Sequence, residues 1–158
     1  MKLHLQDEEG ASWLLSPGER NLLLTLFSRP TEPRQPARLS RDSEALEARC
    51  QADLAGELEQ HRVALRSRLV ALLGAARPFG SAEGEGAGWL FRLTVEDREG
   101  FLQALNELRL GAWEQLGRPD PPEVPPDLAD NAPDILHWWT LEIASRFQGR
   151  LLSAVDPE

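Results

Sequence analysis

Apolar and polar residues alternate at the start of the chain and then change to a helical spacing. Residues 2–6 (Lys-Leu-His-Leu-Gln) alternate in polarity, which predicts a half-buried strand, and residues 13–15 (Trp-Leu-Leu) are compatible with a second short strand. Residues 16–19 (Ser-Pro-Gly-Glu) have the spacing of a capping box with proline at the first helical position. They predict a helix over about 17–28.

A stripe of apolar residues at helical spacing follows, from about Asp42 to Leu73. Its members step by three, four or seven and share one helix face: Leu46, Cys50, Leu54, Leu58, Leu65, Leu69 and Leu72. A helix of roughly 30 residues spans about 45 Å, which exceeds the width expected of a compact domain of this size. We therefore expect this helix to bend, to break near Gly56, or to project its end toward a partner.

The second half of the chain repeats the order of strand, capping box and helix. Residues 89–93 (Trp-Leu-Phe-Arg-Leu) predict a strand, residues 94–97 (Thr-Val-Glu-Asp) begin a helix to about Leu116, and a last helix is expected over 134–153. The whole pattern predicts one α+β domain over 1–158, mostly helical, with four helices and a small antiparallel sheet of two or three strands. Flexible loops are expected near 29–41, 74–88 and 117–133.

Composition indicates a folded protein of a reducing compartment. Apolar residues make up 41% of the chain, and five of its residues are tryptophans. A single cysteine, Cys50, leaves no intramolecular disulfide and no cysteine-based zinc cluster. The chain has no apolar run of the roughly 18 residues that a membrane span needs. We therefore expect a cytoplasmic protein without membrane association.

The net charge of −9 is unevenly distributed. Residues 79–158 hold fifteen of the 26 acidic side chains but six of the 17 basic ones. Such a surface repels phosphate backbones, which argues against nucleic-acid binding. The loop near 29–41 is a local exception because it is rich in arginine: Arg29, Arg34, Arg38 and Arg41. It is interpreted as a solvated loop, as a docking patch for an acidic partner or, in a third functional hypothesis, as a nucleic-acid contact.

Arg109 is the most informative polar residue because a helical wheel places it about 40° from Leu105, inside the apolar face. Asn106 lies at the edge of that face. A buried guanidinium must be paired. Either Arg109 pairs with a carboxylate of another helix, such as Glu142 or Glu57, or it binds an anionic ligand in a pocket. In the third interpretation the aliphatic part of the Arg109 side chain is buried and its guanidinium reaches water.

His61 and Cys50 belong to the apolar stripe of the long helix and lie about 16 Å apart along its axis. That distance is too long for a thiol–imidazole pair, and both are predicted to be core residues. His61 is also the partner of Arg109 in the ligand-binding hypothesis. The sequence contains no H-x-x-x-H, C-x-x-C or G-x-S-x-G motif. We therefore predict no catalytic residue, no metal site and no cofactor.

The adjacent tryptophans of the last helix diverge by about 100°. Trp139 is expected on the inner face with Leu136, Ile143 and Phe147. Trp138 then points to the flank, where an exposed indole marks a protein interface, unless loops cover it.

Residues 104–111 (Ala-Leu-Asn-Glu-Leu-Arg-Leu-Gly), with Trp113 beyond them, resemble the aromatic-x-x-x-LN-D/E-LRL signature of a bacterial family of unknown function. Residues 2–28 and 135–141 are similar to the opening strand and helix and to the closing helix of that family. The chain differs from it in the long proline-rich loops. Some relatives are encoded beside the adaptor of the Clp protease, so the resemblance implies an accessory role in proteolysis.

These observations favour a non-enzymatic interaction or regulatory module that binds a protein partner or a second copy of itself. The alternative is a small anion-binding domain or enzyme that uses Arg109 with His61 and a carboxylate. Asn106 is a further candidate ligand-binding residue beside Arg109.

Overall fold

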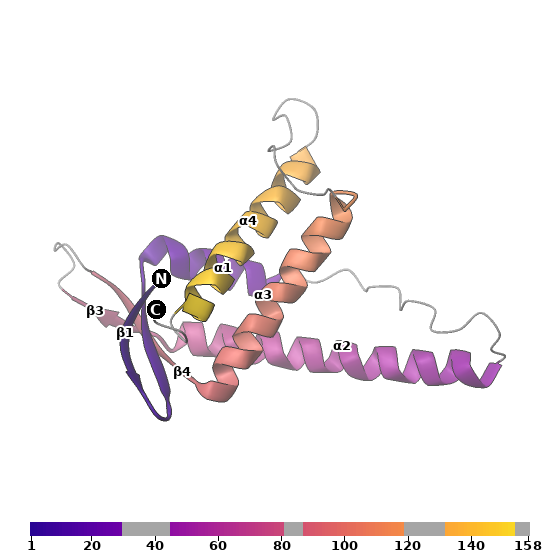
Figure 1. Ribbon diagram of the computed structural model, residues 1–158, viewed down its shortest axis with the longest axis horizontal. Helices are drawn as coiled ribbons and strands as arrows, with labels where there is room; N and C mark the ends of the chain where they lie inside the picture. Colours follow the sequence, from indigo (N-terminus) through magenta and orange to yellow (C-terminus); the bar gives the residue numbers. More distant parts are fainter. Residues whose placement is uncertain (30–44, 81–86, 119–131, 154–158) are drawn as a thin grey trace.

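The computed structural model describes residues 1–29, 45–80, 87–118 and 132–153 (Figure 1). Eight elements occupy these ranges: β1 (Lys2–Asp7), β2 (Gly10–Leu15), α1 (Pro17–Ser28), α2 (Ala45–Gly74), β3 (Arg77–Phe79), β4 (Gly88–Thr94), α3 (Val95–Gln115) and α4 (Ala132–Ser153). The predicted class, α+β and mostly helical with four helices, is confirmed. Much of the three predicted loops, including Arg34, Arg38 and Arg41, lies outside the described residues.

The sheet has four antiparallel strands in the order β1-β2-β4-β3, so the prediction of two or three strands is wrong. The additional strand is β3, which lies in the stretch 74–88 whose composition predicts a loop. Its three residues pair with β4, Arg77 opposite Leu90 and Phe79 opposite Gly88. Pro78 is tolerated in the middle because β3 is an edge strand, which can leave one side of its backbone unpaired.

Burial differs sharply between β1 and the two central strands. Trp13 pairs with Phe91 and Leu15 with Trp89, and this face of the sheet is covered by helices. Every residue of β1 is exposed, so the expectation of a half-buried strand over 2–6 is wrong. The physical reason is that β1 is an edge strand with an irregular register between Leu3 and Leu5, which disrupts its alternation of faces.

Both predicted capping boxes form. Ser16 caps α1 through Glu19, and Thr94 caps α3 through Asp97, with reciprocal side-chain and backbone hydrogen bonds in each case. The two helices therefore begin at the residues that the sequence indicates. Their apolar stripes meet the sheet in one core, in which the fully buried Phe101 ring lies 5.1 Å from Phe27 in an edge-to-face arrangement.

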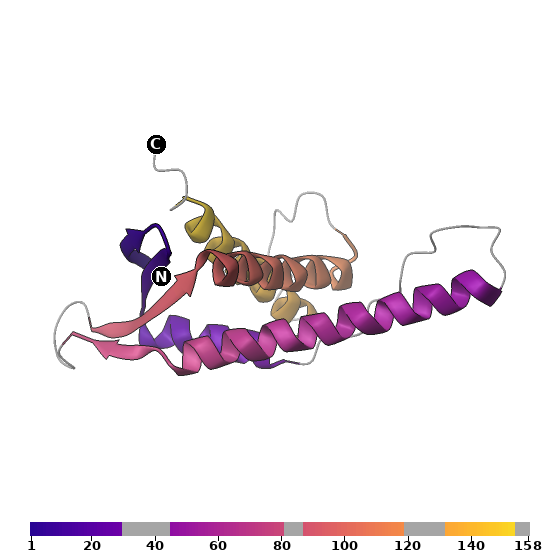
Figure 2. The same cartoon turned by 90° about the horizontal axis from the view of Figure 1, so that it is seen from below.

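The long helix α2 runs without interruption from Ala45 to Gly74, and Gly56 does not break it. Its C-terminal part packs in the body, where Leu69 and Leu73 are fully buried. Its N-terminal part extends well beyond the other described elements (Figures 1 and 2). Of the three expectations for such a long helix, the structure shows the last: the N-terminal end of α2 projects beyond the body.

Helix α4 lies alongside α3 (Figure 1) and buries Leu141, Ala144, Phe147 and Leu151. The predicted inner stripe is therefore wrong at its N-terminal end, where Trp139 is 52% exposed. At 100° per residue, Trp139 lies about 200° from Leu141, on the opposite side of the helix. Trp138 lies only about 60° from Leu141 and is the more covered of the two indoles.

Candidate functional site

The projecting part of α2 carries a row of exposed side chains, which we call the outer α2 face. It consists of Cys50, Leu54, Leu58 and His61. At 100° per residue the four positions fall within an arc of about 80°. Leu54 is 50% exposed and Leu58 is 47% exposed. Leu65 and Leu69 continue the same arc into the body, so the outer α2 face is the core stripe extended beyond the elements that cover it.

Cys50 and His61 are therefore not core residues, and that prediction is wrong. The spacing placed them on the correct side of α2. Both residues lie on the projecting part of α2, where no other described element covers the stripe. Helical periodicity carries no information on where a covering element ends.

Charge is segregated along α2. From Cys50 to Gln60 the charged residues are all acidic: Asp53, Glu57 and Glu59. From His61 to Gly74 they are all basic: Arg62, Arg66 and Arg68. The helix thus presents an acidic projecting half and a basic half that joins the body.

The basic half of α2 is tied to α3 by ion pairs. Arg62 Nε lies 3.3 Å from Oε1 of Glu107, and Arg68 Nη2 lies 2.7 Å from Oδ1 of Asp97. Asp97 also completes the capping box of α3 with Thr94, so one carboxylate joins the start of α3 to α2. These contacts hold the inner half of α2 at a fixed position, and the acidic half extends from that anchor.

A second polar cluster joins β1, α1 and α4 through Glu19. Its carboxylate accepts hydrogen bonds from the N-terminal amino group of Met1, from Arg150 Nη1 at 2.6 Å and from the backbone N–H of Ser16 at 3.0 Å. Burial alone would raise the pKa of Glu19, but these donors outweigh it and lower the pKa to about 2. Burial also lowers the pKa of the Met1 amino group below its usual 8.0.

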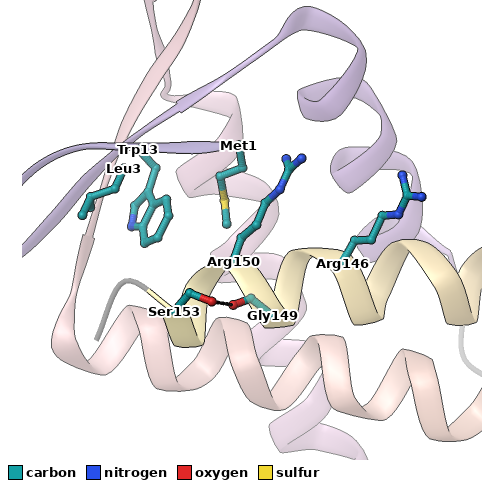
Figure 3. Close-up of a pocket in the computed structure, with 7 residues that line it drawn as sticks. All are labelled: Met1, Leu3, Trp13, Arg146, Gly149, Arg150 and Ser153. Atoms are coloured by element: carbon teal, nitrogen blue, oxygen red, sulfur yellow. Dashed lines mark hydrogen bonds between the residues drawn. The ribbon is translucent and has the colours of Figure 1, made fainter. Parts of the chain in front are cut away.

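A hollow of about 500 Å³ lies beside this cluster, between the sheet and the C-terminal end of α4 (Figure 3). Its lining consists of Met1, Leu3, Trp13, Arg146, Gly149, Arg150 and Ser153. The sequence carries no signal for this hollow. Its lining residues come from 1–13 and 146–153, which only the tertiary fold brings together.

Arg109 is half-buried, and its Nη2 donates a hydrogen bond to Oδ1 of Asn106 at 2.9 Å, on the same helix. Within the part of the chain that the structure describes, no carboxylate lies within ion-pair distance of Arg109. The interhelical pair with Glu142 or Glu57 is thus not formed. Among the described residues, no contact joins Arg109 to His61, and the ligand-binding role of both stays a prediction.

The two adjacent tryptophans of α4 contact each other, with ring centroids 4.9 Å apart in an edge-to-face arrangement. The indole nitrogen of Trp138 is buried and has no hydrogen-bond partner among the described residues. The exposed indole is that of Trp139, opposite to the expected orientation. The interface role of Trp138 stays a prediction.

A metal-binding cluster and a membrane-spanning helix are both missing from the described ranges. No group of three or more His, Cys, Asp or Glu side chains there is arranged to hold a metal ion. In the same ranges no helix combines the length and the apolar character needed to cross a membrane.

Comparisons with family models, curated proteins and solved structures found no match to this chain. The resemblance of residues 104–111 to a bacterial family therefore stays a prediction.

Proposed function

We propose that the protein is a non-enzymatic interaction module that associates with a second copy of itself through the outer α2 face. The observation that carries this proposal is the half-exposure of Leu54 and Leu58 on a helix that leaves the body. Contiguous apolar side chains on a projecting element mark a contact surface more often than isolated ones do.

Charge segregation favours an antiparallel arrangement of the two α2 helices. A parallel pair would place the acidic half, with Asp53, Glu57 and Glu59, against the same half of its partner. An antiparallel pair that overlaps over the outer α2 face directs the N-terminal end of each acidic half toward Arg62, at the start of the basic half of the other helix, which is favourable. A surface of this kind is complementary to itself, as a twofold-symmetric interface requires.

The association is expected to be weak and dependent on concentration. Each half-exposed leucine that leaves water contributes about 1 kcal/mol, and the outer α2 face offers two of them from each copy. That gain must offset the loss of rotational and translational freedom on association. A regulatory contact of this strength can be formed and broken by modest changes of protein concentration.

A cytoplasmic location belongs to the same proposal. Cys50 is an exposed free thiol on the outer α2 face. An exposed thiol at a protein contact persists in a reducing compartment and oxidises in an oxidising one. The implied link with the Clp protease adaptor is a second part of the proposal: a protein of the proteolysis machinery would be the further partner.

Sedimentation velocity of the full chain over a hundredfold range of concentration tests the self-association. We expect the wild-type weight-average mass to rise toward that of a dimer, and Leu54→Glu with Leu58→Glu to keep the chain monomeric. Val95→Glu is the matched control, because Val95 is 46% exposed but lies on α3. A wild-type chain that stays monomeric throughout, or an equal effect of the control, would overturn the proposal.

Cross-linking separates the antiparallel from the parallel arrangement. In an antiparallel pair that overlaps over the outer α2 face, Cys50 of one copy lies opposite His61 of the other. The two Cys50 sulfur atoms are then about 16 Å or more apart and cannot form a disulfide. Mild oxidation is then expected to leave the wild type uncross-linked and to join copies of the His61→Cys variant, through Cys50 of one copy and the new thiol at position 61 of the other. Efficient cross-linking through Cys50 itself would establish the parallel arrangement and contradict ours.

A further inference from the structure

The hollow between the sheet and α4 combines an apolar wall with a cationic rim (Figure 3). Met1, Leu3 and Trp13 supply the apolar wall from β2 and the region around the start of β1. Arg146 and Arg150 extend from successive turns of α4 on the opposite side. Ligand sites commonly have this composition, a mainly apolar surface with a few polar groups that fix orientation. The hollow is shallow and largely open to solvent, so it suits a small ligand that lies along its surface.

The two arginines differ in how far their charge is already satisfied. Arg150 donates to Glu19 at 2.6 Å. Arg146 has no carboxylate within ion-pair distance among the described residues, although it lies one helical turn away. Its guanidinium therefore offers a fork of donors to an anion at the edge of the hollow. This local excess of positive charge stands against a net charge of −9 for the whole chain.

Trp13 adds an independent observation. Its side chain is 2% exposed, and its indole N–H has no hydrogen-bond partner within the described part of the protein. Because no hydrogen bond to a described residue holds it, the resonance of this N–H is sensitive to contacts made at the hollow. In Figure 3 the indole nitrogen lies on the side of Leu3, its cross-strand neighbour on the edge strand β1.

From this geometry we infer that the hollow binds a small amphiphilic anion, a monocarboxylate that carries an unbranched apolar chain. The carboxylate binds the guanidinium of Arg146, and the chain lies over Met1, Leu3 and Trp13. The apolar wall disfavours strongly hydrated anions such as sulfate. A charged rim on one side only disfavours neutral ligands. This site is separate from the outer α2 face and does not depend on self-association.

Octanoate is the probe for this site. Acetate, which has the carboxylate without the long chain, and octan-1-ol, which has the chain without the charge, are its two controls. We would titrate each into the ¹⁵N-labelled full chain and follow the assigned indole N–H resonance of Trp13. Octanoate is expected to give a saturable shift at a concentration at least about tenfold lower than either half, because a hydrogen bond to a charged group contributes at least that factor.

Arginine variants locate the carboxylate. Arg146→Ala is expected to weaken octanoate binding about tenfold or more and to leave octan-1-ol unaffected. Arg118→Ala, an exposed arginine just beyond the C-terminal end of α3, is the matched control and is expected to bind octanoate as the wild type does. No saturable shift of Trp13, binding of octan-1-ol as tight as that of octanoate, or an unchanged affinity in Arg146→Ala would each overturn the inference.

Discussion

Replacement of Glu19 by glutamine tests whether one carboxylate holds β1, α1 and α4 together. Glutamine keeps the size of the side chain and an oxygen for the capping bond of α1, but it removes the charge that faces Arg150 and the Met1 amino group. A pKa lowered from 4.5 to about 2 corresponds to about 3 kcal/mol of stabilisation of the charged form. Because the carboxylate is 26% exposed, solvent screening reduces this to about 2 kcal/mol.

The pH dependence follows from the direction of the shift. The folded protein holds the proton of Glu19 less tightly than the unfolded chain, so this stabilisation is complete above pH 4.5 and is lost as the pH falls toward 2. Glu19→Gln is therefore expected to lower the free energy of unfolding by about 2 kcal/mol at pH 7. The gap between the two proteins is expected to close between pH 4.5 and pH 2.

Urea unfolding followed by tryptophan fluorescence at stepped pH values measures both quantities. Glu8→Gln, at an exposed position in the turn after β1, controls for the change of net charge. A Glu19→Gln protein as stable as the wild type at pH 7 would refute the stabilising role of the Glu19 carboxylate. So would a gap between the two proteins that is the same at pH 3 as at pH 7.

Two further predictions concern backbone and capping contacts. Gly88→Ala is expected to lower the melting temperature in a thermal scan, because an added Cβ would lie 2.5 Å from the carbonyl oxygen of Leu15. The same change at Gly111 meets nothing within 4 Å and is expected to stabilise α3 by about 0.5–1 kcal/mol. Asp97→Ala is expected to cost about 0.5–2 kcal/mol in urea unfolding, and Asp97→Asn less, because asparagine keeps an acceptor for the N-terminus of α3.

The starts of α1 and α3 could be predicted from local signals. The capping boxes at Ser16 and Thr94 satisfy backbone N–H groups a few residues away, so their effect can be predicted without knowledge of the tertiary fold. The strand β4 was equally accessible, because the bulky, mostly apolar run Trp89-Leu90-Phe91-Arg92-Leu93 is typical of a strand. The short edge strand β3 was not, since it is defined by its pairing with β4 rather than by its composition.

The wrong predictions on the helices share one physical cause, which is that periodicity gives the direction of a side chain but not what lies opposite it. Trp139 and His61 both belong to plausible apolar stripes, and both are exposed because no described element lies over them. For the same reason the wheel placed Arg109 in an apolar face and suggested partners on other helices. Its hydrogen bond goes to Asn106, three residues earlier on the same helix, where a turn of helix suffices to join them.

The distribution of polar contacts explains why α2 can project without loosening the body. Arg62 and Arg68 are bonded to α3, and the Glu19 cluster joins α1 to α4, so these fixed charges lie around the core. The projecting half carries carboxylates and half-exposed leucines instead. A change on that half, such as Leu58→Glu, should therefore alter association and leave the unfolding free energy of the body within about 0.5 kcal/mol. If Leu58→Glu lowered both the unfolding free energy in urea and the self-association in sedimentation, the projecting part of α2 would belong to the folded core.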